Sequence, residues 1–269
     1  MKTERVLITG TTSGVGRALL EHFTARGADI ICVNRRRLPE LEIEYPTARF
    51  ECVDVRSSQD VHALITGLAE GNELPDIFIF NAGINRMDND TSLDLDAFRE
   101  VAETNLYGVL NFVAPLLSVP TARSPRHLIA VSSMACYVGN PYGLGYHTSK
   151  RALTACFDVW SRMYAGTDLV FQLVMLGPVR TPMYTMAKEL PHWMVRIKDI
   201  FSASADGAAA AIAEFGRTRS HKLFHPWKAV PLYAAMLIGQ ACIPGFFRGQ
   251  KTLEGKARRQ LAKQRIDLT

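Results

Sequence analysis

Cysteine is sparse in this 269-residue chain, and it is not grouped as a metal site or a disulfide framework would require. The five cysteines are odd in number and scattered, with no C-x-x-C pair among them: Cys32, Cys52, Cys136, Cys156 and Cys242. A dispersed set of this kind is typical of reduced and mostly buried thiols. We therefore expect neither disulfide bonds nor a metal site.

The chain also lacks a large excess of charge of either sign, because its 31 basic residues nearly balance its 26 acidic ones and leave a net charge of +5. No basic run is interleaved with aromatic residues in the manner of single-stranded nucleic-acid binders, so we expect no nucleic-acid partner. The first residues lack the apolar core of a signal peptide, and a strand pattern begins at Arg5. The sequence thus favours a cytoplasmic protein over a secreted one.

Short apolar runs recur along the chain with helical patterns between them. The runs predict strands, and the gaps predict helices at about 14–26, 58–70, 94–117, 144–165 and 203–217. We expect the strands at about 5–9, 29–33, 49–53, 76–80, 127–132 and 169–175, with an edge strand at 221–224. The run Ile77-Phe78-Ile79-Phe80 is apolar throughout, as in parallel strands covered on both faces. The prediction is an α/β fold: one domain with a doubly wound, Rossmann-type parallel sheet between helices, in which ligands bind at the carboxyl ends of the strands.

The loop after the first strand is rich in glycine and leads directly into a helix. Its pattern is Gly-x-x-x-Gly-x-Gly, which differs from the G-x-G-x-x-G fingerprint of dinucleotide sites. Glycine lets a backbone approach a ligand closely, and the N-terminus of a helix attracts phosphate. We predict a phosphate-binding loop, the alternative being a turn without a ligand, with the candidate residues Gly10, Thr12, Ser13, Gly14, Val15 and Gly16.

Arginine, rather than an acid, follows the second strand. An acid at this place binds the 2′-hydroxyl of NAD, whereas arginine accommodates the 2′-phosphate of NADP. Asn34 stands where the acid would be, and Arg35 and Arg36 follow it. A guanidinium also binds phosphate in a bidentate way. The sequence therefore favours NADP(H) as the cofactor, although a solvated run of charge would look the same.

Two further strand ends supply candidate cofactor contacts. Asp54 and Val55 could hold an adenine edge through a carboxylate and a backbone amide, but an aspartate that caps a turn explains Asp54 nearly as well. The stretch Asn81-Ala82-Gly83 follows the fourth strand, where small residues let the backbone pass close to a flat ligand. We expect the amide of Asn81 to tie this loop down.

Tyr146 and Lys150 are four residues apart in a helical pattern, so they lie on one face of the helix. A phenol has a free pKa of about 10, and an ammonium beside it favours the phenolate. Such a pair could exchange a proton near neutral pH, as general acid–base catalysis requires. The spacing alone is a weak signal, because it occurs by chance in many helices.

Two more polar residues point to the same region. Ser133 ends the fifth strand, where its hydroxyl could bond a substrate carbonyl, although serines at strand ends usually cap turns. Asn105 falls inside the apolar row of the helix at 94–117, and a buried amide must be hydrogen-bonded. Asn105 could therefore lock that helix near the Tyr–Lys pair.

These motifs, in this order and at these separations, resemble the short-chain dehydrogenase/reductase family over about residues 5–182. The resemblance implies a catalytic tetrad of Asn105, Ser133, Tyr146 and Lys150. In that tetrad Tyr146 would donate the proton and Ser133 would hold the carbonyl oxygen. Lys150 would bind the nicotinamide ribose and lower the pKa of Tyr146, and Asn105 would hold a water. Tyr146 and Lys150 would thus also contact the cofactor, as would two residues after the sixth strand, Val179 and Thr181.

The chain departs from the family pattern at two loops. The usual Asn-Asn-Ala-Gly reads Phe80-Asn81-Ala82-Gly83, so one amide is lost. The usual Pro-Gly after the sixth strand reads Leu176-Gly177, which is similar to the hydroxysteroid dehydrogenases within the family. Thr181 keeps its place, but the shape of the loop near Pro178 stays open.

The remainder of the chain divides into two stretches of unusual composition. Residues 182–202, the substrate lid in this family, are rich in methionine and aromatic residues, which form adaptable apolar walls; a helix packed on the body is the alternative. Residues 1–228 would form the catalytic domain. The extension 229–269 is first apolar and then basic. We expect it to cap the pocket or to join subunits, with association with a membrane surface through 229–265 as the alternative.

Together these features predict NADPH-dependent reduction of a ketone or aldehyde on a hydrophobic substrate to the alcohol. Relatives in the family commonly pair through the helices that correspond to 94–117 and 144–165, so we expect a homodimer or homotetramer. Two alternatives stay open. One is a cofactor-binding or scaffold protein without catalysis, and the other is isomerase or dehydratase chemistry with the same Tyr–Lys pair.

Overall fold

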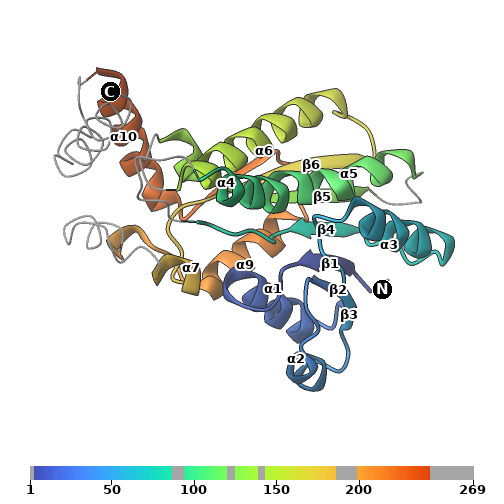
Figure 1. The fold of residues 1–269 in the computed structure, drawn as a ribbon. Helices are drawn as coiled ribbons and strands as arrows, with labels where there is room; N and C mark the ends of the chain where they lie inside the picture. Colours follow the sequence, from blue (N-terminus) through green and yellow to red (C-terminus); the bar gives the residue numbers. More distant parts are fainter. Residues whose placement is uncertain (1–2, 87–93, 120–124, 139–142, 186–198, 243–269) are drawn as a thin grey trace, which may run out of the picture.

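A seven-stranded parallel sheet forms the centre of the computed structural model, which describes residues 3–86, 94–119, 125–138, 143–185 and 199–242. The strands lie in the order β3-β2-β1-β4-β5-β6-β7 (Figure 1). Their bounds are β1 (Arg5–Thr9), β2 (Asp29–Asn34), β3 (Arg49–Cys52), β4 (Ile77–Phe80), β5 (Arg126–Ser133), β6 (Leu169–Leu176) and β7 (Lys222–His225). The order reverses between β1 and β4, which creates the crevice where doubly wound sheets bind ligands.

Helices cover both faces of the sheet because successive strand residues point to opposite sides. Ile8 and Ile30 join one apolar cluster, whereas Leu7 and Ile31 join the other. The first cluster includes residues of α1 (Gly14–Ala25), α2 (Pro39–Glu44) and α9 (Ala205–Phe215). The second includes residues of α3 (Ser58–Glu70), α5 (Gly108–Ser118) and α6 (Leu144–Met163). The predicted doubly wound, Rossmann-type sheet is therefore confirmed.

The predicted helix at 94–117 is divided into three consecutive pieces. They are α4 (Leu95–Ala102), the π-helical segment η1 (Glu103–Tyr107) and α5. Asn105 lies in the middle of the π segment, where it is fully buried. A π segment inserts one extra residue into a helix and interrupts the regular backbone ladder. The expected single α-helix is wrong in this respect.

Two short elements were not expected from the sequence, namely α2 and the 3₁₀ turn η2 (Met134–Tyr137) directly after β5. The 3₁₀ turn η3 (Trp227–Ala229) and the helix α10 (Val230–Cys242) follow β7. Figure 1 shows α10 standing out from the body at one end of the molecule. Among the described residues, no helix has the length and apolar character that crossing a bilayer requires.

Most of the predicted lid, residues 186–198, lies outside the described residues. Its two flanks are joined by backbone hydrogen bonds, since Arg180 N–H donates to the Ala203 carbonyl and Ala203 N–H donates to the Pro178 carbonyl. α7 (Pro182–Thr185) begins the segment. Of the predicted extension 229–269, residues 243–269 also lie outside the described part, so the division at 228 stays a prediction.

Candidate active site

The glycine loop between β1 and α1 depends on the absence of side chains at two positions. Gly10 has a φ of 74°, in the left-handed region that favours glycine. A Cβ placed on Gly16 would lie 1.9 Å from the carbonyl oxygen of Gly10. No side chain fits there, so the loop can curl tightly over the start of α1. The exposed Thr12 and Ser13 lie at the turn, beside the helix N-terminus.

Asn81 holds this loop from the neighbouring strand end. Its Nδ2 donates to the carbonyls of Thr9 at 3.2 Å and Gly10 at 3.0 Å. In return, the Thr9 hydroxyl accepts the backbone N–H groups of Asn81 and Ala82, each at 3.0 Å. The expectation that the Asn81 amide ties its loop down is confirmed. The Asn81 side chain is therefore engaged with protein backbone.

The loops after β1 and β6 meet across the crevice. A Cβ on Gly14 would lie 3.2 Å from Cγ2 of Thr181, and Val179 beside it is buried. Val15 is buried on the first turn of α1, whose N-terminus opens toward the same place. Small residues, exposed hydroxyls and a helix N-terminus suit a diphosphate. These described residues fit the phosphate groups of a dinucleotide.

At the end of β2 the predicted contacts separate into two kinds. Asn34 is buried, and its side chain accepts from Thr11 N–H at 2.8 Å and donates to the Thr11 hydroxyl at 2.9 Å. Asn34 thus supports the glycine loop from below. Arg35 and Arg36 are exposed and remain placed to meet a ligand.

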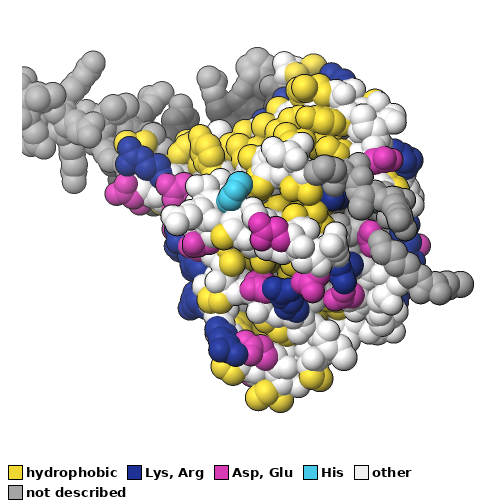
Figure 2. Space-filling view, turned by 90° about the vertical axis from the view of Figure 1, so that its right-hand side faces the viewer, with side chains coloured by type: hydrophobic (Ala, Val, Ile, Leu, Met, Phe, Trp, Pro, Cys, Tyr) yellow, Lys and Arg dark blue, Asp and Glu magenta, His cyan; other side chains and the backbone are white. Residues whose placement is uncertain are grey.

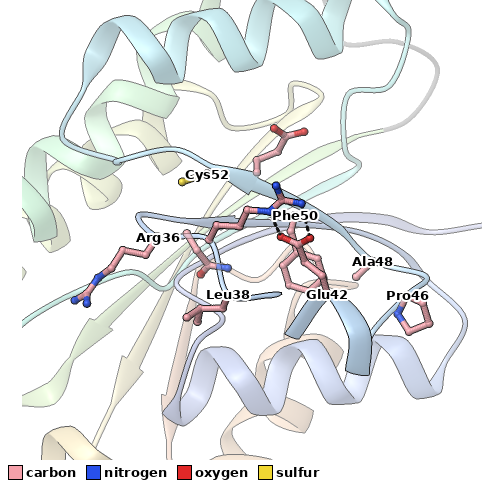
Figure 3. Close-up of a pocket in the computed structure, with 10 residues that line it drawn as sticks. Arg36, Leu38, Glu42, Pro46, Ala48, Phe50 and Cys52 are labelled. Atoms are coloured by element: carbon pink, nitrogen blue, oxygen red, sulfur yellow. Dashed lines mark hydrogen bonds and ion pairs between the residues drawn. The ribbon is translucent and has the colours of Figure 1, made fainter. Parts of the chain in front are cut away.

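A cavity of about 380 Å³ lies beside these arginines, under α2 and against β3 (Figure 3). The next arginine, Arg37, crosses it in a bidentate ion pair with Glu42, at 2.8 Å for each bond. Arg36 points away from the other labelled side chains in Figure 3. The cavity is lined by Asn34, Arg36, Arg37, Leu38, Glu42, Pro46, Ala48, Phe50, Glu51 and Cys52. It lies at the β3 edge, away from the Tyr–Lys pair.

Asp54 and Val55 both have protein partners. The Arg56 guanidinium binds the Asp54 carboxylate, with a shortest contact of 2.6 Å, and holds the pKa of that carboxyl below its usual value. The carbonyl of Val55 accepts from the Asn111 amide at 2.9 Å. The turn-capping alternative for Asp54 is also present, since its carboxylate accepts the Arg56 N–H at 3.0 Å. Contact with adenine stays a prediction for both residues.

Ser133, Tyr146 and Lys150 meet at the carboxyl end of β5. The Ser133 hydroxyl accepts Ala135 N–H at 3.2 Å, donates to the Leu176 carbonyl at 3.3 Å and bonds with the Tyr146 phenol. Ser133 therefore caps a turn and also reaches the predicted proton donor. Lys150 Nζ lies 6.0 Å from the centroid of the Tyr146 ring.

Burial governs the ionisation of both members of the Tyr–Lys pair. It raises the pKa of Tyr146, a shift that the interaction with the Ser133 hydroxyl opposes. It also lowers the pKa of Lys150 to about 8, because this residue is only 4 % exposed. Lys150 Nζ donates to the Val131 carbonyl at 2.7 Å. Desolvation of the phenolate is the largest influence on the pKa of Tyr146, so the net direction is upward, and the lowering effect of Lys150 stays a prediction.

Asn105 is bonded to the loop after β4 and to α6. Its Oδ1 accepts Ile84 N–H at 2.8 Å, and its Nδ2 donates to the Ile84 carbonyl at 2.9 Å and to Ser149 Oγ at 3.1 Å. Ser149 in turn donates to the carbonyl of Tyr146 at 2.9 Å. Asn105 thus fixes the helix that carries Tyr146. Both protons of its Nδ2 are used. The predicted water would therefore have to bond to an oxygen of Asn105.

Sequence reasoning missed three residues of this site. Ser149 lies within the Tyr–Lys stretch, but nothing in its neighbours signals the bond to Asn105. Cys136, on η2, is buried close to Tyr146. Tyr233 of α10 lies near Tyr146 and Cys136, and α10 contacts η2. Its separation in sequence from Tyr146 hides this proximity.

The histidines give no metal site in the described part of the chain. His221 and His225 are four residues apart, which on a helix would place them together. They occur instead at β7, and no group of three or more potential ligands is found among the described residues. His221 bonds to Asp158 at 2.7 Å.

The model of the short chain dehydrogenase family matches residues 4–191, most of the chain and all of the loops described above. The chain belongs to this family. The family resemblance inferred from the motifs is thereby confirmed.

Curated proteins of the family are similar to this short-chain dehydrogenase at modest identity. Dehydrogenase/reductase SDR family member 7B of Rattus norvegicus is 28% identical over 65% of this chain, which spans 58% of that protein. A 3alpha-hydroxysteroid dehydrogenase of Mediterraneibacter gnavus is 24% identical over 70% of this chain and 79% of its own length. The chain thus spans little more than half of the first of these relatives.

Solved structures of short-chain dehydrogenases share the fold. One from Streptomyces avermitilis aligns with a TM-score of 0.76 at 20% identity, over 94% of this chain and 99% of that one. The aldohexose dehydrogenase of Thermoplasma acidophilum aligns with a TM-score of 0.71 at 20% identity, over 83% of this chain and 92% of that one. At these identities the likeness establishes the architecture alone.

Proposed function

We propose that this short-chain dehydrogenase uses NADPH to reduce a ketone or aldehyde on a hydrophobic substrate to the alcohol. The observation that carries the proposal is the meeting of Ser133, Tyr146 and Lys150 at the carboxyl edge of the sheet. The loops that carry Gly14 and Thr181 meet at the same carboxyl edge of the sheet. A nicotinamide dinucleotide would supply the hydride when bound there.

Each side chain has a defined part in the proposed reduction. The Ser133 hydroxyl turns its one proton from the Leu176 carbonyl to the substrate carbonyl oxygen, and Tyr146 gives its phenolic proton to the developing alkoxide. The raised pKa of Tyr146 keeps the phenol protonated at neutral pH, which is the form that a reductase needs. Lys150 carries the positive charge that stabilises the phenolate left behind. Asn105 and Ser149 hold α6, which carries Tyr146, in place.

The preference for NADPH rests on the end of β2. No carboxylate stands there to bind a 2′-hydroxyl, because Asn34 takes that place and is bonded to Thr11. Arg35 and Arg36 are exposed next to it and suit a 2′-phosphate. The nearest acid of α2 in this region, Glu42, is already paired with Arg37. The charge of the site therefore favours the phosphorylated cofactor.

An apolar substrate is favoured by the wall that faces the catalytic residues. Leu232, Tyr233 and Met236 form the less exposed face of α10, and α10 packs against η2 next to Ser133. One relative in the family is named a 3alpha-hydroxysteroid dehydrogenase, and this name also supports an apolar substrate. A bulky aliphatic or aromatic ketone fits such a wall better than a sugar does.

The test is NADPH consumption by the full chain against carbonyl compounds graded from small aldehydes to bulky apolar ketones. We expect turnover to concentrate at the bulky apolar end. Tyr146→Phe should reduce kcat by about 10²–10⁴-fold, as removal of a general acid does. It should leave NADPH binding, measured by cofactor fluorescence, within about two-fold, since the cofactor cradle is unchanged. Normal turnover by Tyr146→Phe would remove Tyr146 from the mechanism.

The oligomeric state is also a proposal, that of a homodimer or homotetramer formed through α4, α5 and α6. Exposed apolar residues on these helices and on the segment between them support it: Leu95, Tyr107, Leu144, Val159 and Met163. Light scattering on the purified chain tests the mass directly. A monomer at micromolar concentration would refute the proposal.

A further inference from the structure

Apart from Gln240, whose side chain lies outside the described part, the helix α10 (Val230–Cys242) is apolar on both of its faces. One face, with Leu232, Tyr233, Met236 and Gly239, is partly or fully buried against the body. A globular helix normally turns polar residues to water on the opposite face. In α10 the residues whose exposure is described, which are all but Gln240, include these exposed ones: Val230, Pro231, Ala234, Ala235, Leu237, Ile238, Ala241 and Cys242.

The exposure of this outer face is substantial. Leu237 is 46% exposed and Ile238 is 63% exposed. At the base of the helix Trp227 is 78% exposed, and Lys228 Nζ donates to the carbonyl of Ile200, which is itself 66% exposed. An apolar surface of this kind marks a docking site. Its charge surroundings indicate what docks there.

The net positive charge of the chain resides entirely in the residues that follow α10. Residues 243–269 contain seven of the 31 basic residues and only two of the 26 acidic ones. Residues 1–242 are therefore balanced, with 24 of each sign. On the face shown in Figure 2, basic and acidic side chains are intermixed over the body. An apolar helix face continuous in sequence with a basic segment matches the two components of an anionic membrane surface.

We propose that the outer face of α10, defined by Leu237 and Ile238 and extended at its base by Trp227, docks on an anionic lipid surface. Residues 243–269 would supply the attraction to the headgroups, and each basic residue near such a surface strengthens binding roughly five-fold. The inner face of α10 contacts η2 beside the catalytic residues. An apolar substrate dissolved in the lipid would then lie on the other side of a single helix from Tyr146. This docking does not depend on the proposed reductase activity.

The experiment is co-sedimentation of the full chain with vesicles of phosphatidylcholine alone and with vesicles that also contain phosphatidylserine. We expect binding to the anionic vesicles at least about ten-fold stronger than to the neutral ones, and a decrease in raised salt. Trp227 should report the docking by a blue shift of its fluorescence with anionic vesicles. The Trp227→Phe variant should lose that shift.

The substitutions Leu237→Asp and Ile238→Asp together should weaken anionic-vesicle binding by at least about ten-fold, because charge opposes insertion of this face. Ile43→Asp is the matched control, since Ile43 is 80% exposed on α2. It should bind as the wild type does. Far-ultraviolet circular dichroism, which needs no enzymatic activity, reports that the double variant is folded. Equal binding to both vesicle types, or unchanged binding of the double variant, would overturn the proposal. The proposal would also be overturned if the wild type formed a stable dimer and the double variant were a monomer.

Discussion

The buried Lys150 costs the fold stability whenever its amine is charged. Burial lowers its pKa from 10.5 to about 8, so the folded protein binds this proton more weakly than the unfolded chain does. The stability associated with neutral Lys150 is therefore complete above about pH 10.5 and is lost as the pH falls through about 8. At neutral pH the Lys150 ammonium therefore destabilises the fold, but the proposed chemistry needs its positive charge.

Replacing this lysine should exchange activity for stability. We expect Lys150→Met to increase the free energy of unfolding by about 2–3 kcal/mol at pH 7, after allowance for the lost bond to Val131, and by roughly half as much at pH 9.5. Turnover should fall to background. Urea unfolding of both proteins at the two pH values measures the difference. A pH-independent gain, or a loss of stability at pH 7, would contradict the assignment.

The adjacent arginines Arg35 and Arg37 allow a matched test of cofactor choice. Arg35 is exposed beside the cofactor crevice, whereas Arg37 is held by Glu42 in two bonds of 2.8 Å. Arg35→Ala should weaken NADPH binding about ten- to a hundred-fold, which is the effect of losing a charge-assisted hydrogen bond. NADH binding should change by less than about two-fold. Arg37→Ala should affect neither cofactor, as titration calorimetry would show. Equal losses for NADPH and NADH would refute the 2′-phosphate assignment.

The loop between β1 and α1 leaves no room for a side chain at Gly16. Gly16→Ala would place a Cβ 1.9 Å from the Gly10 carbonyl oxygen, so the loop has to open. We expect this variant to lose dinucleotide binding. Gly67→Ala is its control, because a Cβ at Gly67 in α3 meets nothing within 4 Å. That control should bind cofactor normally and gain about 0.5–1 kcal/mol of stability, which chemical denaturation detects. Cofactor binding by Gly16→Ala would show that the loop is not the cradle.

The π segment shows what periodicity in a sequence cannot reveal. Phe98, Val101, Asn105 and Val109 keep a helical spacing, so the pattern predicted one continuous α-helix. The extra residue of a π turn leaves no trace in that spacing. It is instead compatible with long-range bonds, from Asn105 to Ile84 and Ser149, that no local pattern encodes. The existence of the helix was predictable, whereas its internal geometry depended on tertiary contacts.

At the scale of the whole molecule, burial on both faces made the sheet predictable. Runs such as Ile77-Phe78-Ile79-Phe80 are apolar throughout because helices cover each side, and the predicted strands agree with the observed ones to about one residue. The proximity of Tyr233 to Tyr146 was not predictable, since it depends on how α10 returns over η2. The direction of the Tyr146 pKa also required the fold, because it is set by burial rather than by the spacing to Lys150.

The cofactor crevice is assembled from loops after β1, β2, β4 and β6, so a bound dinucleotide should stabilise the molecule as a unit. At a hundred times its Kd, NADPH should add about 2.7 kcal/mol to the free energy of unfolding. This corresponds to a rise in Tm of roughly 5–10 °C for a domain of this size. Tyr146→Phe should keep the full shift, because the phenol acts on the proton, and Gly16→Ala should show none. Scanning calorimetry with and without NADPH separates the two cases. Loss of the shift in Tyr146→Phe would mean that the phenol contributes substantially to holding the cofactor.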